Sequence, residues 1–291
     1  MANNNDKKVL NVPALRFPEF TGEWEIVSLK DIAVVNPKSE PLLNKFFYID
    51  LESVEKGELK KIQEILQEEA PSRAQRVISN NDILFQCVRP YQKNNYIHRV
   101  KNTSNIQWIA STGYAQIRTT ESPNYIYHLL NTDGFNRKVM VRCTGSSYPA
   151  INSEDLSAIR FYLSTDKKEQ CKIARLLDLL DERISTQNKI IEDLKKLKSA
   201  IIDKLYSSTN GETYSFRQLF EVVNEKNKAR AYKNVLSASQ ELGMIERSDI
   251  NIDIKFEQES ISGYKIVRKG DYVVHLRSFQ GGFAFSDRTR P

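Results

Sequence analysis

Residues 166 to 206 constrain the fold of this chain more than any other segment. They contain neither Gly nor Pro, and Ile173, Leu180, Leu194 and Ile201 recur at multiples of seven positions. Parallel rows of apolar residues widen this stripe, which is the pattern of a helix packed against other helices. At about 1.5 Å per residue, such a helix would extend roughly 60 Å. We therefore predict one coiled-coil helix over residues 166–207.

The ends of this helix carry ordinary start and stop signals. Thr165 or Ser164 can cap the start, and Asn210 and Gly211 follow the end. A helix in an ordinary all-α core is the alternative, which the β-rich flanking sequence disfavours. The side chains expected to contact other subunits are Ile173, Leu177, Leu180, Ile184, Ile191, Leu194, Leu197 and Ile201.

Residues 25–165 have a mixed pattern, and residues 1–24 form an N-terminal arm. Short runs at 46–51, 77–88 and 114–118 are typical of strands, since β-branched and aromatic residues alternate with polar turns. The charged segment 52–69 predicts a loop and a helix. Residues 125–141 predict a short helix that is broken near Gly134. The fold class expected is α+β.

After the helix, part of the first domain recurs. Residues 28–32 resemble 215–219, residues 34–36 resemble 222–224, and residues 77–83 resemble 266–272. The matches keep their order, and the offset grows by one residue from each match to the next. A period this long indicates a duplicated domain. Residues 212–291 are therefore predicted to be a partial second copy, without a counterpart of residues 108–163.

No catalytic signature stands out. The chain has no Gly-Lys dipeptide for a Walker A loop, no Pro-Asp pair, and three histidines without metal-ligand spacing. Its three cysteines are far apart, which disfavours a zinc or disulfide framework and fits a reducing, cytoplasmic location. No secretory signal or membrane span is visible. We expect neither catalysis by this chain nor a cofactor.

Nucleic-acid binding is better supported. The net charge is +6, and residues 83–120 and 134–153 contain no acid at all. Lys and Arg neutralise phosphates, while Asn, Gln and Arg have the geometry that reads base edges. Solvated loops on a basic protein would give the same pattern. The residues predicted to bind DNA are Arg89, Tyr91, Lys93, Asn94, Asn95, Lys101, Thr112, Tyr114, Arg137, Arg142, Gly145, Ser146, Ser147 and Tyr148.

The segment 143–152 is rich in turn residues. Gly145 can adopt a positive φ, and Ser146 and Ser147 offer hydroxyl groups. It is either a purely structural tight loop or a loop that places hydroxyls and amides on a phosphate. The residues alone do not distinguish the two.

These residues also carry a family resemblance. Residues 145–156, followed by 169–174, 179–181 and Ile184, resemble the junction between recognition domain and helical spacer in the specificity subunit of type I restriction-modification systems. The arm, with residues 15–20 and Trp24, resembles the start of that subunit. The resemblance covers the whole chain, although it identifies no base-contacting residues, because recognition domains vary.

The resemblance implies two target-recognition domains held apart by antiparallel spacer helices. Each domain would read one half of a split site in double-stranded DNA. The spacer would dock methyltransferase subunits and, through them, the ATP-driven restriction subunit. Catalysis and S-adenosylmethionine binding would belong to those partners.

The chain departs from this pattern because it has one spacer helix and an incomplete second domain. We expect a fragment of a longer chain or a natural truncation. A half-subunit whose helix associates with a second copy is also open. The rival function is a coiled-coil assembly protein whose β-rich domain binds protein.

Overall fold

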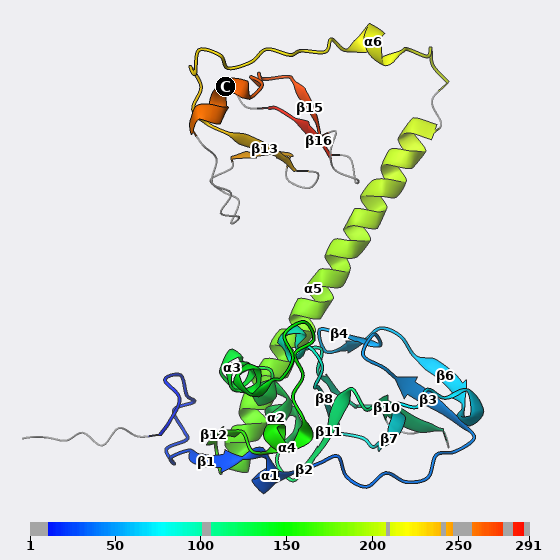
Figure 1. Cartoon of the computed structure of the whole chain (residues 1–291), viewed down its shortest axis with the longest axis vertical. Coiled ribbons are helices and arrows are strands. Elements are labelled where there is room, and N and C mark those ends of the chain that lie inside the picture. The colour runs from blue at the N-terminus through cyan, green and yellow to red at the C-terminus, as the bar shows by residue number, and fades with distance from the viewer. Residues whose placement is uncertain are drawn as a thin grey trace, which may run out of the picture. The chain divides into compact units, whose positions relative to one another are not determined.

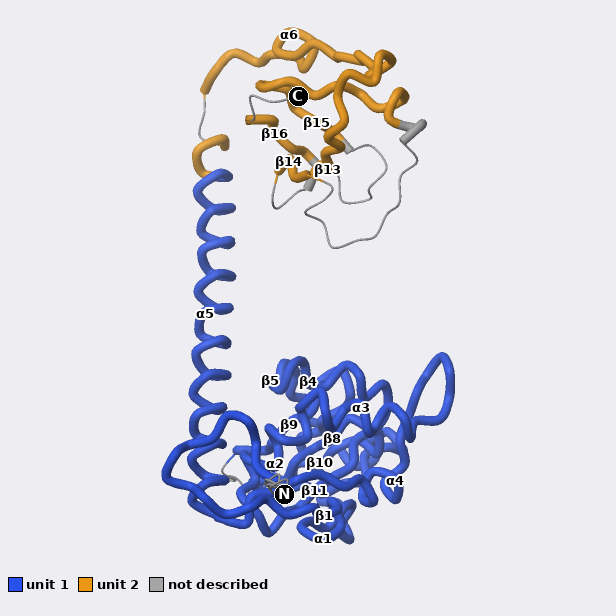
Figure 2. The backbone as a smooth tube through the Cα atoms, turned by 90° about the vertical axis from the view of Figure 1, so that its left-hand side faces the viewer, with its two compact units in different colours: residues 1–203 blue, residues 204–291 orange. Residues whose placement is uncertain are grey.

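The computed structural model describes residues 11–100, 106–207, 210–239, 243–246, 258–275 and 282–287 of the 291-residue chain. The chain divides into two compact units, residues 1–203 and residues 204–291 (Figure 2). Unit 1 combines a β-rich body with most of one long helix, and unit 2 contains short strands. The predicted α+β fold class is confirmed.

Two four-stranded sheets form the body of unit 1 (Figure 1). The first has the order β2-β11-β8-β9 and is antiparallel throughout. The second has the order β6-β3-β10-β7, in which only β3 and β10 run parallel. The strands are β2 (Ala33–Val35), β3 (Lys45–Ile49), β6 (Gln63–Leu66), β7 (Ala74–Ile78), β8 (Ile83–Gln86), β9 (Tyr96–Ile97), β10 (Gln107–Ser111) and β11 (Tyr114–Thr119).

Short helices bury one face of the first sheet. They are α1 (Leu29–Ile32), α2 (Pro123–Leu130), α3 (Asp133–Arg142) and α4 (Ser153–Ser157). Leu29, Ile117, Ile126 and Leu156 are fully buried in this core, and burying such side chains drives folding. Strand β1 (Glu25–Ser28) pairs with β12 (Arg160–Leu163), which joins the start of the domain to its end.

The charged segment 52–69 is not helical as predicted. It forms the hairpin of β4 (Val54–Glu55) and β5 (Glu58–Leu59), then β6 and the single turn η1 (Gln67–Glu69). Lys56 and Gly57 have φ values of 49° and 81°, a left-handed pair that makes a tight turn and cannot continue a helix. The helical prediction was wrong because the charge pattern of this segment fits an exposed hairpin equally well.

The break between α2 and α3 lies earlier than predicted. Asn131 and Thr132 separate the two helices, and Gly134 lies inside α3. The Thr132 side chain accepts a hydrogen bond from the Phe135 backbone N at 3.2 Å, so Thr132 caps the second helix.

Helix α5 (Lys167–Ser207) is continuous, as predicted. Its cap is Asp166, whose Oδ1 accepts from the Lys168 backbone N at 2.8 Å, rather than Thr165 or Ser164. The hydroxyl of Ser164 instead donates to Glu169 Oε2 at 2.5 Å. Among the described residues, no helix is long and apolar enough to cross a membrane.

Unit 2 contains α6 (Phe216–Leu219), β13 (Leu236–Ser239), β14 (Gly243–Glu246), η4 (Gln258–Gly263), β15 (Tyr272–His275) and β16 (Gly282–Phe285). Its helix α6 starts with a capping box between Ser215 and Gln218, as α1 does between Ser28 and Asp31. The sequence repeat therefore corresponds to the same local structure in both units.

The second half of the repeat agrees in finer detail. Asp82 accepts from the Ser79 backbone N at 2.8 Å, and Asp271 accepts from the Arg268 backbone N at 2.7 Å. The residue before each aspartate has a positive φ, at Asn81 (71°) in unit 1 and Gly270 (94°) in unit 2. The strand that follows is then paired in the same antiparallel way in each unit, as β8 with β9 and β15 with β16.

Candidate nucleic-acid interface

The turn after β8 projects polar side chains from the first sheet. Arg89 and Lys93 have φ values of 54° and 53° and bracket the single turn η2 (Pro90–Gln92). Pro90 is buried, whereas Tyr91 is 50% exposed. Gln92 Oε1 accepts from Gln86 Nε2 at 2.9 Å, which fixes the turn to the end of the strand. The two left-handed residues that flank the η2 turn therefore leave the Tyr91 side chain exposed.

The segment after α3 closes into a loop, residues 144–150, which we call the Gly145 loop. Thr144 and Ala150 form a β-bridge at its base. Gly145 has a φ of 89°, and a Cβ there would lie 2.9 Å from the Tyr148 carbonyl O. Glycine is thus required twice, by backbone conformation and by space.

The Gly145 loop lies directly on the η2 turn. The Arg89 backbone N donates to Pro149 O at 2.7 Å, and Val88 forms a β-bridge with Ala150. The Arg89 guanidinium lies 4.2 Å from the centre of the Tyr148 ring, a cation–π contact. Two segments that the sequence places in separate acid-free windows therefore share one surface.

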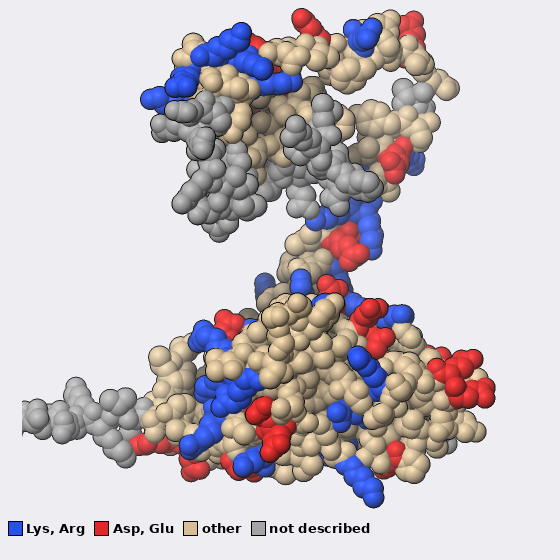
Figure 3. All heavy atoms as spheres, in the orientation of Figure 1, with Lys and Arg blue, Asp and Glu red and all other residues tan. Residues whose placement is uncertain are grey.

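Helix α3 borders the same turn. Phe135 and Val139 are buried on its inner face, and the Phe135 ring packs edge-on against Phe85 and Phe161. Its exposed side carries Arg137, Lys138, Val141 and Arg142. In Figure 3, Lys and Arg side chains gather over the region where Figure 1 draws α3.

One acid interrupts this basic surface. Asp133, in the first turn of α3, forms an ion pair with Lys93 of the η2 turn. The hydrogen bond and charge of Lys93 lower the pKa of Asp133. The pair ties helix and turn together while neutralising the only acid between residues 122 and 153. We define the basic face as Arg89, Tyr91, Lys93, Arg137, Lys138, Val141, Arg142 and the Gly145 loop.

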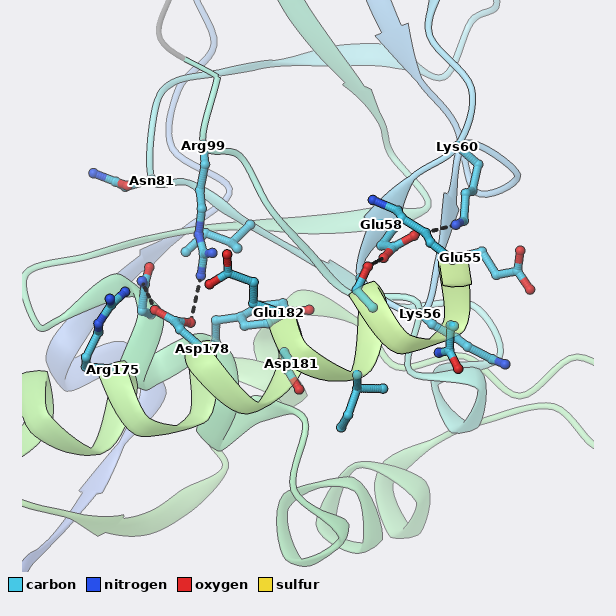
Figure 4. Close-up of a pocket in the computed structure, with 18 of the residues that line it drawn as sticks. Glu55, Lys56, Glu58, Lys60, Asn81, Arg99, Arg175, Asp178, Asp181 and Glu182 are labelled. Atoms are coloured by element: carbon cyan, nitrogen blue, oxygen red, sulfur yellow. Dashed lines mark hydrogen bonds and ion pairs between the residues drawn. The ribbon is translucent and has the colours of Figure 1, made fainter. Parts of the chain in front are cut away.

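A separate cleft of about 1110 Å³ lies between α5 and the β4–β5 hairpin (Figure 4). Acidic and basic side chains mix along its walls, including Glu58, Arg99 and Asp178. Asp178 accepts from Arg99 Nη2 at 3.0 Å and from Asn124 Nδ2 at 2.6 Å, and it lies 2.8 Å from His128 Nε2. This network anchors α5 to the domain. Sequence reasoning missed it, because the partners are far apart along the chain.

Comparison with known proteins identifies the family. The sequence model of the type I restriction modification DNA specificity domain matches residues 21–196. The chain belongs to this family. No curated protein sequence matches this chain.

Two solved structures resemble this chain. One comes from work on complex assembly and conformational transition of the type I R-M system. It has 24% identity and a TM-score of 0.52, and the match covers 66% of this chain and 52% of that one. The other is the HsdS subunit from Thermoanaerobacter tengcongensis, with 24% identity, a TM-score of 0.48, and coverage of 66% and 51%. The chain thus spans about half the length of the structures it matches.

The structure places two of the predicted DNA-binding residues in the interior of unit 1. Asn95 is 2% exposed, and its amide bonds the Gln86 backbone N and the Asn131 side chain. Tyr114 is fully buried, and its hydroxyl donates to Asp50 O at 3.2 Å. Both predictions are corrected, since a buried and bonded side chain cannot contact a duplex at the surface.

Two further predicted residues are half-buried, and a third lies outside the described residues. Asn94 is half-buried and accepts from the Lys56 backbone N at 3.1 Å. Thr112 is half-buried in the β10–β11 turn, where the neighbouring Gly113 carbonyl accepts from the Cys87 backbone N at 3.0 Å. Lys101 lies outside the described residues.

The predicted contact stripe of α5 divides along its length. Ile173 packs against the core of unit 1, and Leu177 is half-buried. The other six are each between 48% and 59% exposed: Leu180, Ile184, Ile191, Leu194, Leu197 and Ile201.

Proposed function

We propose that unit 1 binds double-stranded DNA through the basic face and reads part of its sequence there. The observation that carries this proposal is the packing of the Gly145 loop on the η2 turn, with Arg89 over Tyr148. It brings residues from two distant acid-free segments onto one exposed surface. Membership of a DNA specificity family supports the same function.

The chemistry of the basic face suits both parts of the task. Lys138 can neutralise a phosphate, which supplies affinity without sequence information. Arg137 can present a guanidinium to the acceptor edge of guanine in the major groove. Gly145, Ser146 and Ser147 offer backbone amides and hydroxyls to a phosphate, which favours the functional interpretation of this loop over the purely structural one.

The finer assignment follows the family resemblance. Unit 1 would read one half of a split site, and α5 would dock methyltransferase and restriction subunits that supply catalysis. The half-exposed apolar stripe of α5 supports a helical partner. A second copy of the chain could cover the same stripe.

The salt dependence of binding separates this proposal from a protein-binding role. The basic face has five Lys and Arg side chains, so log K for a duplex should fall against log salt with a slope of about −4 to −5. Affinity would then drop roughly several hundred-fold between 50 and 200 mM salt. Fluorescence anisotropy with a labelled random-sequence duplex measures this. A flat dependence would favour the coiled-coil assembly protein.

Single arginine variants test the location of the surface. Arg89→Ala and Arg142→Ala should each weaken DNA binding by about 1–3 kcal/mol if the side chains reach base edges. Arg183→Ala is the matched control, because Arg183 is exposed on α5, and Figures 1 and 2 together place α3 apart from that helix. Wild-type affinity in both test variants would remove this surface from the proposal.

A further inference from the structure

One apolar side chain stands out on the basic face. Val141, near the end of α3, is 84% exposed, and among the large apolar side chains of the described residues only Leu15, at 91%, is more exposed. Val139, two positions earlier, is fully buried. The helix therefore buries one valine and displays the other.

The surroundings of Val141 are cationic rather than apolar. Residues spaced by three, four and seven positions share a helix face, so Gly134, Arg137, Lys138 and Val141 lie along one side of α3. Arg142 follows directly, and its Nη1 donates to the Lys138 carbonyl O at 3.1 Å. Gly134 has no heavy atom within 4 Å of where a Cβ would lie, so nothing in the fold requires a glycine there for space.

This composition favours DNA over protein as the partner of the face. A protein interface is built around a cluster of apolar or aromatic anchors, with charge depleted at its centre. On this side of α3 a single valine lies among three cations, and the exposed aromatic side chains of the basic face, Tyr91 and Tyr148, come from other segments. In the major groove, the matching apolar group is the C5-methyl of thymine, flanked by acceptor edges and phosphates that cations bind.

We propose that Val141 is a specificity-determining residue that contacts the C5-methyl group of a thymine in the major groove. Arg137 and Arg142 hold α3 against the flanking phosphates or guanine. This inference rests on the proposed DNA-reading function. The inference adds to that function the element that enters the groove, α3, and the chemical group that this helix recognises, the thymine methyl.

Removing the thymine methyl provides the test. Duplexes that bind the full chain are selected from a random pool, and each thymine of the enriched sequence is replaced by deoxyuridine in turn. One substitution should weaken wild-type binding about fourfold, the loss expected for one buried methyl group. The Val141→Ala variant should bind the thymine and deoxyuridine duplexes equally.

Two controls keep the result interpretable. Val34→Ala removes an exposed valine from β2 and should retain the fourfold ratio. Alanine favours helix more than valine, so Val141→Ala should leave α3 folded, which circular dichroism checks.

The possible failures differ from one another. Absence of any enriched sequence would contradict the proposed function itself. An enriched sequence with no methyl effect at any thymine, or with an effect that Val141→Ala retains, would overturn the role of Val141 while DNA reading stands.

Discussion

Replacing Glu169 by glutamine is expected to lower the free energy of unfolding of unit 1 by about 3–5 kcal/mol, the usual loss when one partner of a buried ion pair is removed. The Glu169 carboxylate is fully buried at the root of α5. It accepts from Arg16 Nε at 2.6 Å and Nη2 at 2.8 Å, from Trp24 Nε1 at 3.1 Å and from the Ser164 hydroxyl. One carboxylate thus joins the N-terminal arm to α5.

The same contact predicts a dependence on pH. The hydrogen bond from Arg16, with those from Ser164 and Trp24, lowers the pKa of Glu169 from its ordinary value of 4.5. Its contribution to stability is therefore fully present above pH 4.5 and is lost as pH falls through the lowered pKa. The difference in stability between wild type and Glu169→Gln should shrink across that acidic range. Urea denaturation at several pH values measures it.

Two variants control for the change of side chain. Glu192→Gln alters an exposed glutamate on the same helix that forms a surface ion pair with Lys196, and it should leave the unfolding midpoint unchanged. Adding Arg16→Met to Glu169→Gln should recover part of the loss, because the unpaired guanidinium is removed as well. Equal midpoints for wild type and Glu169→Gln would show that the arm does not stabilise the helix root.

The extent of α5 could be predicted because its signal is local. A heptad pattern without Gly or Pro reports helix directly, whatever surrounds it. Its cap could not be predicted in the same way. The Ser164 oxygen accepts from the Asp166 backbone N at 3.2 Å while its hydroxyl donates to Glu169, so Ser164 closes the turn before the helix and Asp166 caps it. Several neighbouring polar residues suit a cap, and residue type alone does not show at which one the helix begins.

The candidate interface was predictable in composition but not in geometry. Acid-free windows located Arg89 and Tyr148, and only the fold shows that they touch. The same windows included Asn95 and Tyr114, whose polar groups form hydrogen bonds inside unit 1. An amide or phenol that suits base recognition also suits a buried hydrogen bond, so residue type alone cannot separate the two. Val141 gave no signal, since an apolar residue in a helix is usually assigned to the core.

Replacing Asp82 by alanine is expected to destabilise unit 1 by about 1–3 kcal/mol, because the buried Gln116 amide and the half-exposed Arg118 guanidinium both lose this acceptor. Asp82 is 1% exposed. It accepts from Arg118 Nε and Nη2 at 2.8 and 2.7 Å, and from Gln116 Nε2 at 2.8 Å. Asp82 also holds the turn that precedes β8. The η2 turn, which carries Arg89 at its start, follows the other end of that strand. We therefore expect DNA affinity to fall together with stability.

The internal repeat supplies the matched control. Asp271 holds the equivalent turn of unit 2, and the hydrogen bond described for its side chain comes from the Arg268 backbone N. Among the contacts of the described residues, Asp271→Ala therefore removes the turn contact but no side-chain bond like those that Asp82 makes with Gln116 and Arg118. The chain has two tryptophans, Trp24 and Trp108, and both lie in unit 1, so their fluorescence follows that unit alone. Asp82→Ala should shift the fluorescence-detected urea midpoint and Asp271→Ala should not. An unchanged midpoint for Asp82→Ala would show that the network around Asp82 does not stabilise unit 1, and equal shifts would show that the effect of either variant is not confined to its own unit.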